Sequence, residues 1–389
     1  MKVVIVRNED FSTWHFSRGL ISTLIQRGIE VTVVTPDGPY VPKLVGLGAK
    51  HVVVSFYRFT SPLRDLKLCF QLYRVFRTEK PDVVHNMSVK PNVYGALAAW
   101  LAGVPKIVSL VCGAGYAFSE TRGWKQRVLR FLVSRLYWLA GKVTHRTWFL
   151  NNDDLSLFVE CSFTTPEKAV LISSEGINLK DYSPNNVSPD ALSSLREEFG
   201  VDDSTIVVLL MLQRITWSKG VKEFVEASER STKWRTAVKF IMVGGLDPDS
   251  PDPVPEEYLR PTQQFAWVGF RSDVAEVLAL ADIVTLPSFY REGVPRNLLE
   301  ALAMKKPIVT TDNVGCRDVV DHGKNGFLVR VRDTDAFAVA VEKLVSDSEL
   351  RASFGRHSLA KARREFDEEI VNRRVLTELY GLDGGEHSK

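Results

Sequence analysis

Two glutamates stand eight residues apart in the stretch REGVPRNLLEALAMKKPIVTT, with a glycine and a proline between them. Pro295 fits the first turn of a helix, which we predict to run from Pro295 to Met304. Glu292 then lies in the loop before this helix, and Glu300 lies two turns inside it. The N–H groups at a helix start favour an anion such as a diphosphate, and Gly293 lets the backbone approach it closely. The carboxylates could then accept hydrogen bonds from sugar and ribose hydroxyls; the alternative is a solvated helix with an acidic start.

A pair of cations follows another apolar run, in LLMLQRITWSKGVKEF. We predict that a strand ends at Leu212 and that Arg214 and Lys219 lie in the loop after it. Gly220 then opens the next helix. Open α/β sheets bind ligands at the carboxyl ends of their strands, where two cations can clamp a diphosphate. Each cation alone fits an ordinary solvated loop, but the acidic loop in the same half of the chain favours a site.

Glycines at two further strand ends could line the same site. Gly244 belongs to VGG, and Gly269 belongs to VGFRSDV, where Phe270 follows it. A diglycine also fits a plain tight turn, whereas Gly269 leaves room for a nucleotide base against the backbone.

Short apolar strands alternate with helical patterns along the chain, which is typical of parallel sheets covered by helices on both faces. The polar stretch NLKDYSPNNVSPDALSSLREEFGVDD interrupts this alternation. We therefore predict an α/β protein with two Rossmann-like βαβ domains. The N-terminal domain covers 1–178, a linker 179–202 and the C-terminal domain 203–365. The tail 366–389 is expected to form a helix that packs back on the N-terminal domain.

The composition is that of a globular protein, with 45% hydrophobic and 25% charged residues among 389. The charged N-terminal segment MKVVIVRNED fits a buried strand rather than a signal peptide. No apolar stretch approaches the roughly 20 residues of a spanning helix. The four cysteines are far apart and form no C-x-x-C, which suits a reducing cytoplasm.

Charge is distributed unevenly between the halves of the chain. Residues 1–190 carry 23 Lys and Arg against 15 Asp and Glu, a net charge of +8. Residues 191–389 carry 27 against 32, a net charge of −5. Between Thr121 and Asn152 there are seven basic residues and no acidic one. Such a block favours contact with phosphates of a nucleic acid, an anionic membrane or a phosphorylated ligand.

The basic block includes a helical pattern in TRGWKQRVLRFLVSRLYWLAGKVTHR. An apolar stripe is formed by Val128, Phe131, Leu132, Leu136 and Leu139. This stripe fits a core helix with a solvated basic face, but the absence of acids favours a membrane interface. No nucleic-acid-binding module is recognisable, so we expect no nucleic-acid partner. The residues expected at the membrane are Trp124, Arg127, Arg130, Arg135 and Trp138.

The C-terminal half resembles the family 4 retaining glycosyltransferases of GT-B fold, in which two Rossmann-like domains face each other across a cleft. The resemblance rests on R-x4-KG at Arg214, VGG, VGFRSDV, and the E-x7-E motif between Glu292 and Glu300. It implies a nucleoside-diphosphate sugar as co-substrate, with no bound cofactor and no metal. It also implies catalytic roles for Glu292, Arg214 and Lys219. The donor site that it implies comprises Arg214, Lys219, Gly244, Phe270, Glu292, Gly293, Val294 and Glu300.

The N-terminal half resembles a narrower group, through VVHNMSVKPNVYGALAAWLAGVPKIV. Members of this group are bacterial hexosaminyltransferases that extend polyprenyl-diphosphate-linked sugars for O-antigen, capsule or glycoprotein glycans. Two features depart from the family pattern. Cys112 stands where many members carry His, and RNEDFSTWHFSRG replaces a glycine pair after the first strand. Whether the side chain at position 112 has a role, and whether the loop near Phe11 faces a phosphate, are therefore two open questions.

Five residues of the N-terminal half are candidates for acceptor binding: His15, Arg18, Asn86, Lys90 and Tyr116. Each has a plainer alternative. His15 could be a packed loop histidine, Lys90 a solvated lysine before Pro91, and Tyr116 an aromatic residue beneath a loop.

The sequence thus predicts a GT-B hexosyltransferase on the inner face of the cytoplasmic membrane. It would move an N-acetylhexosamine from a UDP donor to a lipid-diphosphate-linked saccharide, with retention. Cations and a helix N-terminus would stabilise the leaving diphosphate. A sugar-nucleotide epimerase of the same fold and a non-catalytic sugar-nucleotide-binding protein are the alternatives. A nicotinamide oxidoreductase lacks support, because no G-x-G-x-x-G follows the first strand.

Overall fold

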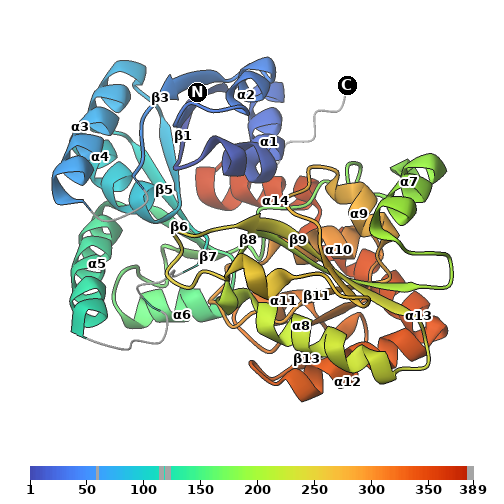
Figure 1. Cartoon of the computed structure of the whole chain (residues 1–389). Helices are drawn as coiled ribbons and strands as arrows, with labels where there is room; N and C mark the ends of the chain where they lie inside the picture. Colours follow the sequence, from blue (N-terminus) through green and yellow to red (C-terminus); the bar gives the residue numbers. More distant parts are fainter. Residues whose placement is uncertain (58–60, 114–117, 119–123, 383–389) are drawn as a thin grey trace. The chain divides into compact units, whose positions relative to one another are not determined.

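The structure is a computed structural model that describes residues 1–57, 61–113, 118 and 124–382. Contacts divide the chain into two compact units (Figure 1). Unit 1 comprises Met1–Gly176 and Glu368–Lys389, and unit 2 comprises Ile177–Asp367. Each unit contains one parallel sheet with helices, so the predicted α/β class with two Rossmann-like parts is confirmed.

The sheet of unit 1 has seven strands in the order β3-β2-β1-β4-β5-β6-β7. Helices cover both of its faces, which is why every residue of β4 is buried, including the polar His85 and Asn86. The strand β7 is short and was not predicted. The strands are β1 (Lys2–Arg7), β2 (Glu30–Thr35), β3 (Lys50–Val53), β4 (Val83–Met87), β5 (Lys106–Val111), β6 (Arg146–Phe149) and β7 (Ala169–Leu171).

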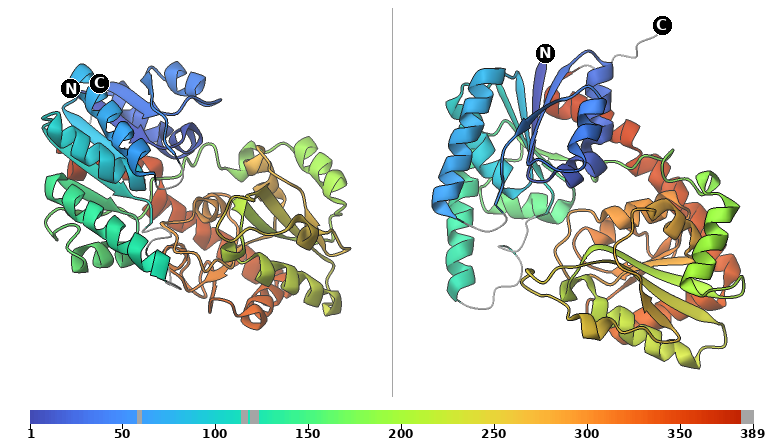
Figure 2. Two further views of the ribbon diagram at one scale, coloured as in Figure 1. Left: turned by 60° about the vertical axis from the view of Figure 1, so that its left-hand side comes forward. Right: turned by 45° about the horizontal axis from the view of Figure 1, so that its top comes forward.

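Three helices cover one face of this sheet: α3 (Pro62–Glu79), α4 (Ala96–Leu101) and α5 (Trp124–Val143). They share a core with the strands, in which Leu72, Ala98 and Ala140 pack with Val4 and Val84. The other helices of this part are α1 (Asp10–Gln26), α2 (Val41–Gly46) and α6 (Asn152–Glu160). Figures 1 and 2 show α3, α4 and α5, coloured light blue to green, beside one another. In the described ranges, no helix combines the length and apolarity needed to cross a bilayer.

The C-terminal segment belongs to unit 1, where α14 (Glu368–Arg374) lies against α1. A helical turn, Val375–Tyr380, follows it. The Tyr380 hydroxyl lies 2.7 Å from Nδ1 of His85, and both side chains are buried. Burial lowers the pKa of His85 to about 3, with a contribution from the Arg7 guanidinium, so the ring is neutral. Asn372 adds a second contact, because its Nδ2 donates to the Thr23 hydroxyl.

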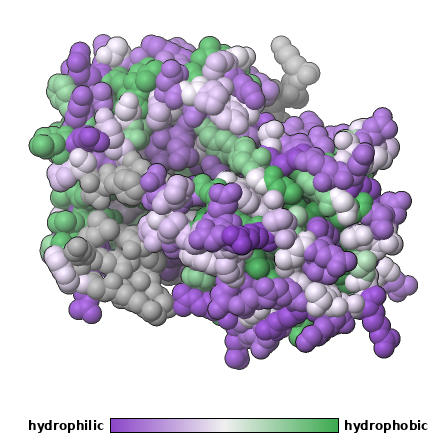
Figure 3. All heavy atoms as spheres, viewed as in Figure 1, coloured by the Kyte–Doolittle hydropathy of each residue, from purple (hydrophilic) through white to green (hydrophobic). Residues whose placement is uncertain are grey.

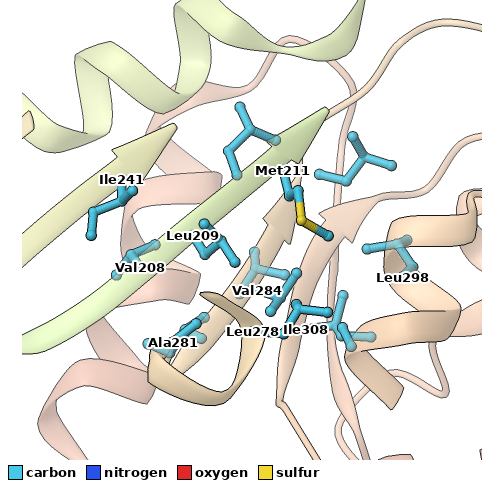
Figure 4. Packing of buried hydrophobic residues seen from close by; sticks show 14 of the residues in the cluster. Val208, Leu209, Met211, Ile241, Leu278, Ala281, Val284, Leu298 and Ile308 are labelled. Atoms are coloured by element: carbon cyan, nitrogen blue, oxygen red, sulfur yellow. The ribbon is translucent and has the colours of Figure 1, made fainter. Parts of the chain in front are cut away.

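Unit 2 contains a six-stranded sheet in the order β10-β9-β8-β11-β12-β13. Its core is built from β-branched and aliphatic residues of the strands together with Leu278 and Leu298 from two helices (Figure 4). The strands are β8 (Ile206–Ile215), β9 (Val238–Leu246), β10 (Phe265–Trp267), β11 (Ile283–Leu286), β12 (Ile308–Thr311) and β13 (Gly326–Val329). The helices are α7 (Pro189–Phe199), α8 (Val221–Arg230), α9 (Val274–Leu280), α10 (Arg296–Ala303), α11 (Cys316–Val319), α12 (Thr334–Ser346) and α13 (Ser348–Lys361).

The segment 179–202, expected as a linker, is grouped by its contacts with unit 2. Its helix α7 buries Leu195 and Phe199 in the core of that unit. The Ser188 hydroxyl accepts a hydrogen bond from the N–H of Ala191 at the helix start, and Gly200 ends the helix with a φ of 61°. Only one stripe of the helix is apolar, which is why the segment looks like a linker in the sequence.

The buried contact of Tyr380 with His85 should contribute to the stability of unit 1. Tyr380→Phe removes one hydrogen bond and leaves a buried ring nitrogen without its partner, which costs about 1–3 kcal/mol. We expect a lower urea midpoint for the transition of unit 1, whereas Tyr258→Phe in unit 2 serves as the control. An unchanged midpoint would show that the hydrogen bond between Tyr380 and His85 does not contribute to the stability of unit 1.

Candidate active site

The first feature of the site is an irregularity between strands β8 and β9. The pairing shifts register between Met211 and Arg214, so Arg214 lies inside β8 rather than in the loop predicted for it. Gly244 has a φ of 153°, and a Cβ there would lie 2.7 Å from the Leu212 carbonyl oxygen. Such bulges redirect side chains next to active sites. The exposed Arg214 guanidinium points to Asp247, with 3.7 Å between Nη1 and Oδ2.

A tight turn after β8 delivers the second cation. Residues 217–219 form a helical turn, and Gly220 takes a φ of 82° before α8 begins. A Cβ at Gly220 would lie 2.2 Å from the carbonyl oxygen of Pro287, at the end of β11. Only glycine allows this close approach, which brings Lys219 to the loop after β11.

Lys219 and Glu292 form the central ion pair of the site. Nζ of Lys219 lies 2.5 Å from Oε1 of Glu292, and the Ser288 hydroxyl donates to the same oxygen at 3.0 Å. Glu292 is buried, whereas Lys219 is half-buried. Nζ also lies 5.0 Å from the centroid of the Tyr290 ring. Burial raises the pKa of Tyr290, and the Glu292 carboxylate adds to this effect, so the phenol stays protonated.

Side chains from the end of β12 hold the loop that carries Glu292. The Thr311 hydroxyl donates to the Ser288 carbonyl, and Nδ2 of Asn313 donates to the Tyr290 carbonyl at 2.6 Å. Gly315 has a φ of 77°, and a Cβ there would lie 2.1 Å from the Gly293 carbonyl oxygen. This packing fixes the backbone of the loop directly behind Glu292.

Helix α10 begins at Arg296 and ends at Ala303, with Pro295 and Met304 as flanking residues. The predicted helix is therefore found, but Glu300 lies one turn inside it and not two. Glu300 is buried, and its Oε1 lies 3.2 Å from Nε of Arg296. This burial excludes the alternative of a solvated helix residue for Glu300.

The remaining donor candidates lie near the same edge of the sheet. Phe270 follows β10 and is exposed, while Gly269 has a φ of 74° and an added Cβ there would meet nothing within 4 Å. The Trp267 indole donates to the Gly244 carbonyl at 2.9 Å and joins β10 to β9. Val294 packs on the core of unit 2. Because the strands are parallel, the ends of β8, β9, β10 and β11 meet at one edge.

Sequence reasoning missed the residues that support this site. They are Ser288, Arg296, Asn313 and Gly315. The only signal for them was their position, since each follows a strand or begins a helix next to a predicted residue. Their partners are set by contacts between segments far apart in the chain, which spacing alone does not reveal.

Two acceptor candidates of unit 1 lie on α1. The His15 ring packs 4.3 Å from the ring of Phe11 and 5.1 Å from that of Tyr40, measured between centroids. The Arg18 guanidinium lies 5.4 Å from the Trp14 ring. Both residues are half-buried.

The other acceptor candidates are placed differently. Asn86 is fully buried in β4, where its side chain lies against Gly95. Nζ of Lys90 lies 2.6 Å from Oδ1 of the buried Asp65, which makes this lysine part of a structural ion pair. Tyr116 lies outside the described residues.

A partly buried cluster at the end of β1 was not predicted. The Arg7 guanidinium donates to both carboxylate oxygens of Glu175, at 2.6 and 2.8 Å. Cys112 lies beside this pair, with Sγ 3.9 Å from Arg7 Nη2. Burial raises the pKa of the Cys112 thiol to about 12, so the thiol is neutral.

The apolar stripe of α5 faces outward. Val128, Phe131, Leu132 and Leu139 are exposed, so the alternative of a core helix is wrong for these four residues. Trp124 and Trp138 are exposed as well, and the helix is anchored by Tyr137 and Ala140. The cations pack on aromatic faces: Arg130 on Phe118, Arg135 on Phe131 and Lys142 on Trp138.

Comparison with known proteins gives the family. Residues 195–360 match the family model described as "Glycosyl transferases group 1", and residues 13–149 match "Glycosyl transferase 4-like domain". An N,N'-diacetylbacillosaminyl-diphospho-undecaprenol alpha-1,3-N-acetylgalactosaminyltransferase of Campylobacter jejuni is 32% identical over 377 residues, 97% of each chain. The chain belongs to the group 1 glycosyl transferases. The family membership that the sequence resemblance implied is thereby confirmed, and the protein is a glycosyltransferase.

Two further similarities support this assignment. A UDP-Gal:alpha-D-GlcNAc-diphosphoundecaprenol alpha-1,3-galactosyltransferase of Escherichia coli is 28% identical over 81% of this chain and 79% of its own length. The crystal structure of Anabaena HepE in complex with UDP superimposes with a TM-score of 0.78, at 22% identity. It covers 98% of this chain and 100% of its own, which shows the GT-B fold for this glycosyltransferase.

The support of the Glu292 loop by Gly315 should be necessary for transfer. A methyl group in Gly315→Ala meets the Gly293 carbonyl, so the loop must move; a shift of about 1 Å can lower rates up to about 100-fold. We expect kcat to fall at least about tenfold, with an unchanged circular dichroism spectrum. Gly323→Ala is the matched control, because Gly323 has a φ of 76° with nothing within 4 Å of the added Cβ. Equal activity of the two variants would contradict a positioning role for Gly315.

Proposed function

We propose that this glycosyltransferase moves a sugar from a nucleoside-diphosphate donor to a lipid-diphosphate-linked saccharide, with retention of anomeric configuration. The observation that carries the proposal is the ion pair of Lys219 and Glu292 beside Arg214 at one sheet edge of unit 2. The names of the Campylobacter and Escherichia relatives support the acceptor class, because both act on sugars linked to diphosphoundecaprenol. Bacterial O-antigen, capsule or glycan assembly is the context that fits such an acceptor.

We assign the donor to unit 2. The diphosphate would be held by Arg214 and Lys219, which stabilise the negative charge that grows on the leaving group. Lys219 then exchanges a contact with Glu292 for one with phosphate, while Glu292 keeps the Ser288 hydroxyl and accepts a hydrogen bond from a hydroxyl of the donor sugar. Glu300 would bind the ribose at the start of α10, where Arg296 fixes its carboxylate.

The other donor residues would contribute close backbone approach or side-chain packing against the ligand. Gly244 and Gly293 let the chain approach the diphosphate and the sugar, and Val294 closes the side of the sugar. The exposed ring of Phe270 would lie against the base. UDP is the proposed nucleotide, and N-acetylhexosamine the proposed sugar; the Campylobacter relative is named as an N-acetylgalactosaminyltransferase. No bound cofactor has a part in this scheme.

We assign the acceptor to unit 1. His15 and Arg18 are the candidates on α1 that are not fully buried, and Arg18 supplies a cation for the acceptor diphosphate. Asn86 and Lys90 are left out, because one is buried and the other pairs with a buried aspartate. Membership of a transferase family favours transfer over the epimerase and the sugar-nucleotide sensor.

We further propose that unit 1 rests on the inner face of the cytoplasmic membrane through α5. Exposed tryptophans suit the interface between headgroups and acyl chains, and Arg127, Arg130 and Arg135 suit anionic headgroups. Each cation near such a surface contributes about 1 kcal/mol.

Mass spectrometry of reaction products tests the proposed reaction. The protein is incubated with a panel of UDP-sugars, with and without a short polyprenyl-diphosphate-sugar acceptor. We expect a product heavier by one N-acetylhexosamine, formed only with acceptor present, and NMR should show the anomeric configuration of the donor. Conversion of the donor without acceptor would indicate an epimerase. A donor that binds but stays intact with every acceptor would indicate a sensor.

Lys219 should act on the transition state more than on donor binding. Lys219→Ala removes the cation that meets the growing charge of the leaving diphosphate, so we expect kcat to fall by about 100-fold or more. The dissociation constant of UDP, measured by calorimetry, should rise far less. Lys222→Ala is the control, because Lys222 is an exposed lysine of the neighbouring α8 that pairs with Glu226. Unchanged turnover of Lys219→Ala at saturating donor would refute the role.

A further inference from the structure

A second apolar stripe lies on the outer face of α3. Leu63, Leu66 and Phe70 are 83%, 69% and 59% exposed. Their spacing of three and four residues places them on one side of the helix. The opposite side of α3 buries Leu68 and Leu72, among others, in the core of unit 1, so the outer stripe is not needed for folding.

The outer face of α3 is positively charged. Its four cations are all exposed: Arg64, Lys67, Arg74 and Arg77. The helix contains two acidic residues, and neither opposes these cations. Asp65 is buried and pairs with Lys90, while Glu79 lies at the far end and pairs with Lys50 at 2.7 Å.

Neighbouring elements extend this surface. The Arg64 guanidinium lies 4.4 Å from the centroid of the exposed Tyr57 ring, just before α3. The next helix, α4, exposes Trp100 and Leu101 and contacts both α3 and α5. Figure 1 shows α3 and α5 along the same edge of unit 1, and Figure 3 shows apolar side chains in green along that edge. A rim of cations around exposed apolar groups marks an interaction surface.

We propose that the outer face of α3 is a second lipid-binding surface, in addition to that of α5. In this arrangement Leu63, Leu66 and Phe70 enter the acyl-chain boundary of an anionic bilayer, and the four cations bind its headgroups. Exposed apolar side chains with cations beside them on the same face of a helix can enter the interface while the long basic side chains reach the headgroups. The inference rests on the proposed function only for the location at the membrane. The lipid contact itself is argued from the exposed apolar and basic side chains of α3.

Charge selects lipid over a second copy of this chain. A symmetric dimer through this face would place the same patch against itself, with four cations from each copy and no exposed acid to neutralise them. Anionic headgroups supply the complementary charge. The apolar stripe would be covered at the same time, which removes the cost of its exposure to water.

Vesicle sedimentation of the full chain tests the inference. The variant is Leu63→Ser/Leu66→Ser/Phe70→Ser, and the vesicles contain phosphatidylcholine with about one third phosphatidylglycerol. We expect the partition coefficient between vesicles and water to fall about tenfold or more, because the variant lacks the three apolar side chains that would be transferred from water into the bilayer. The matched control is Val45→Ser/Val331→Ser/Val339→Ser, which removes three exposed apolar residues elsewhere and should bind as the wild type does. Transfer to a short-chain soluble acceptor should be unaffected by either variant.

Each alternative outcome is distinguishable. Binding of the α3 variant at the wild-type level overturns the inference, and leaves the α5 proposal intact if Arg127→Gln/Arg130→Gln/Arg135→Gln lowers binding. A wild-type dimer that the α3 variant converts to a monomer identifies a second copy as the partner and also overturns it. Wild-type protein that ignores anionic vesicles at low salt overturns both membrane proposals. Normal vesicle binding without transfer to any acceptor would reject the proposed function and leave the α3 surface supported.

Discussion

The ion pair of Lys219 and Glu292 is the interaction on which the geometry of unit 2 depends. Its two charges come from segments 73 positions apart, at the ends of β8 and β11. A buried carboxylate without a cation costs several kcal/mol, so the turn and the loop are stable together and not separately. The Ser288 hydroxyl provides a second partner for Glu292. A ligand phosphate could therefore take Lys219 without leaving Glu292 unpartnered.

Glycine provides the backbone geometry that this pair requires. Gly220, Gly244 and Gly315 all have positive φ values, and an added Cβ at each would lie under 3 Å from a carbonyl oxygen. The close contacts join strand ends to neighbouring loops, so the edge of the sheet is compact without large side chains. Preorganisation of this kind lets fixed dipoles and charges act on a reacting group without rearrangement.

Unit 1 uses charge in two different ways. Inside, Arg7 pairs with Glu175 and Lys90 pairs with Asp65, so the buried charges are neutralised by the fold itself. Outside, the cations of α3 and α5 stand beside exposed apolar side chains and suit external anions. The net positive charge of this half of the chain is therefore a surface property, whereas its buried charges contribute to its structure.

The sequence by itself determined the parallel α/β class, most strands and the helix after Glu292, because hydrophobic periodicity is a local property. It also pointed to the donor candidates Arg214, Lys219, Glu292 and Glu300, because they lie near predicted strand ends and a helix start. Contacts with distant segments decided two features that the sequence did not predict. They form the short strands β7 and β13, and they place residues 179–202 in unit 2. Spacing did not distinguish exposed from buried side chains either. Asn86 and Lys90 resembled acceptor residues but are buried or paired. The stripe of α5 fitted a core helix as well as the favoured membrane interface, and four of its residues are exposed. Only tertiary packing decides which side of an amphipathic helix meets the sheet, because α3 and α5 each carry apolar residues on two sides and the sheet covers only one.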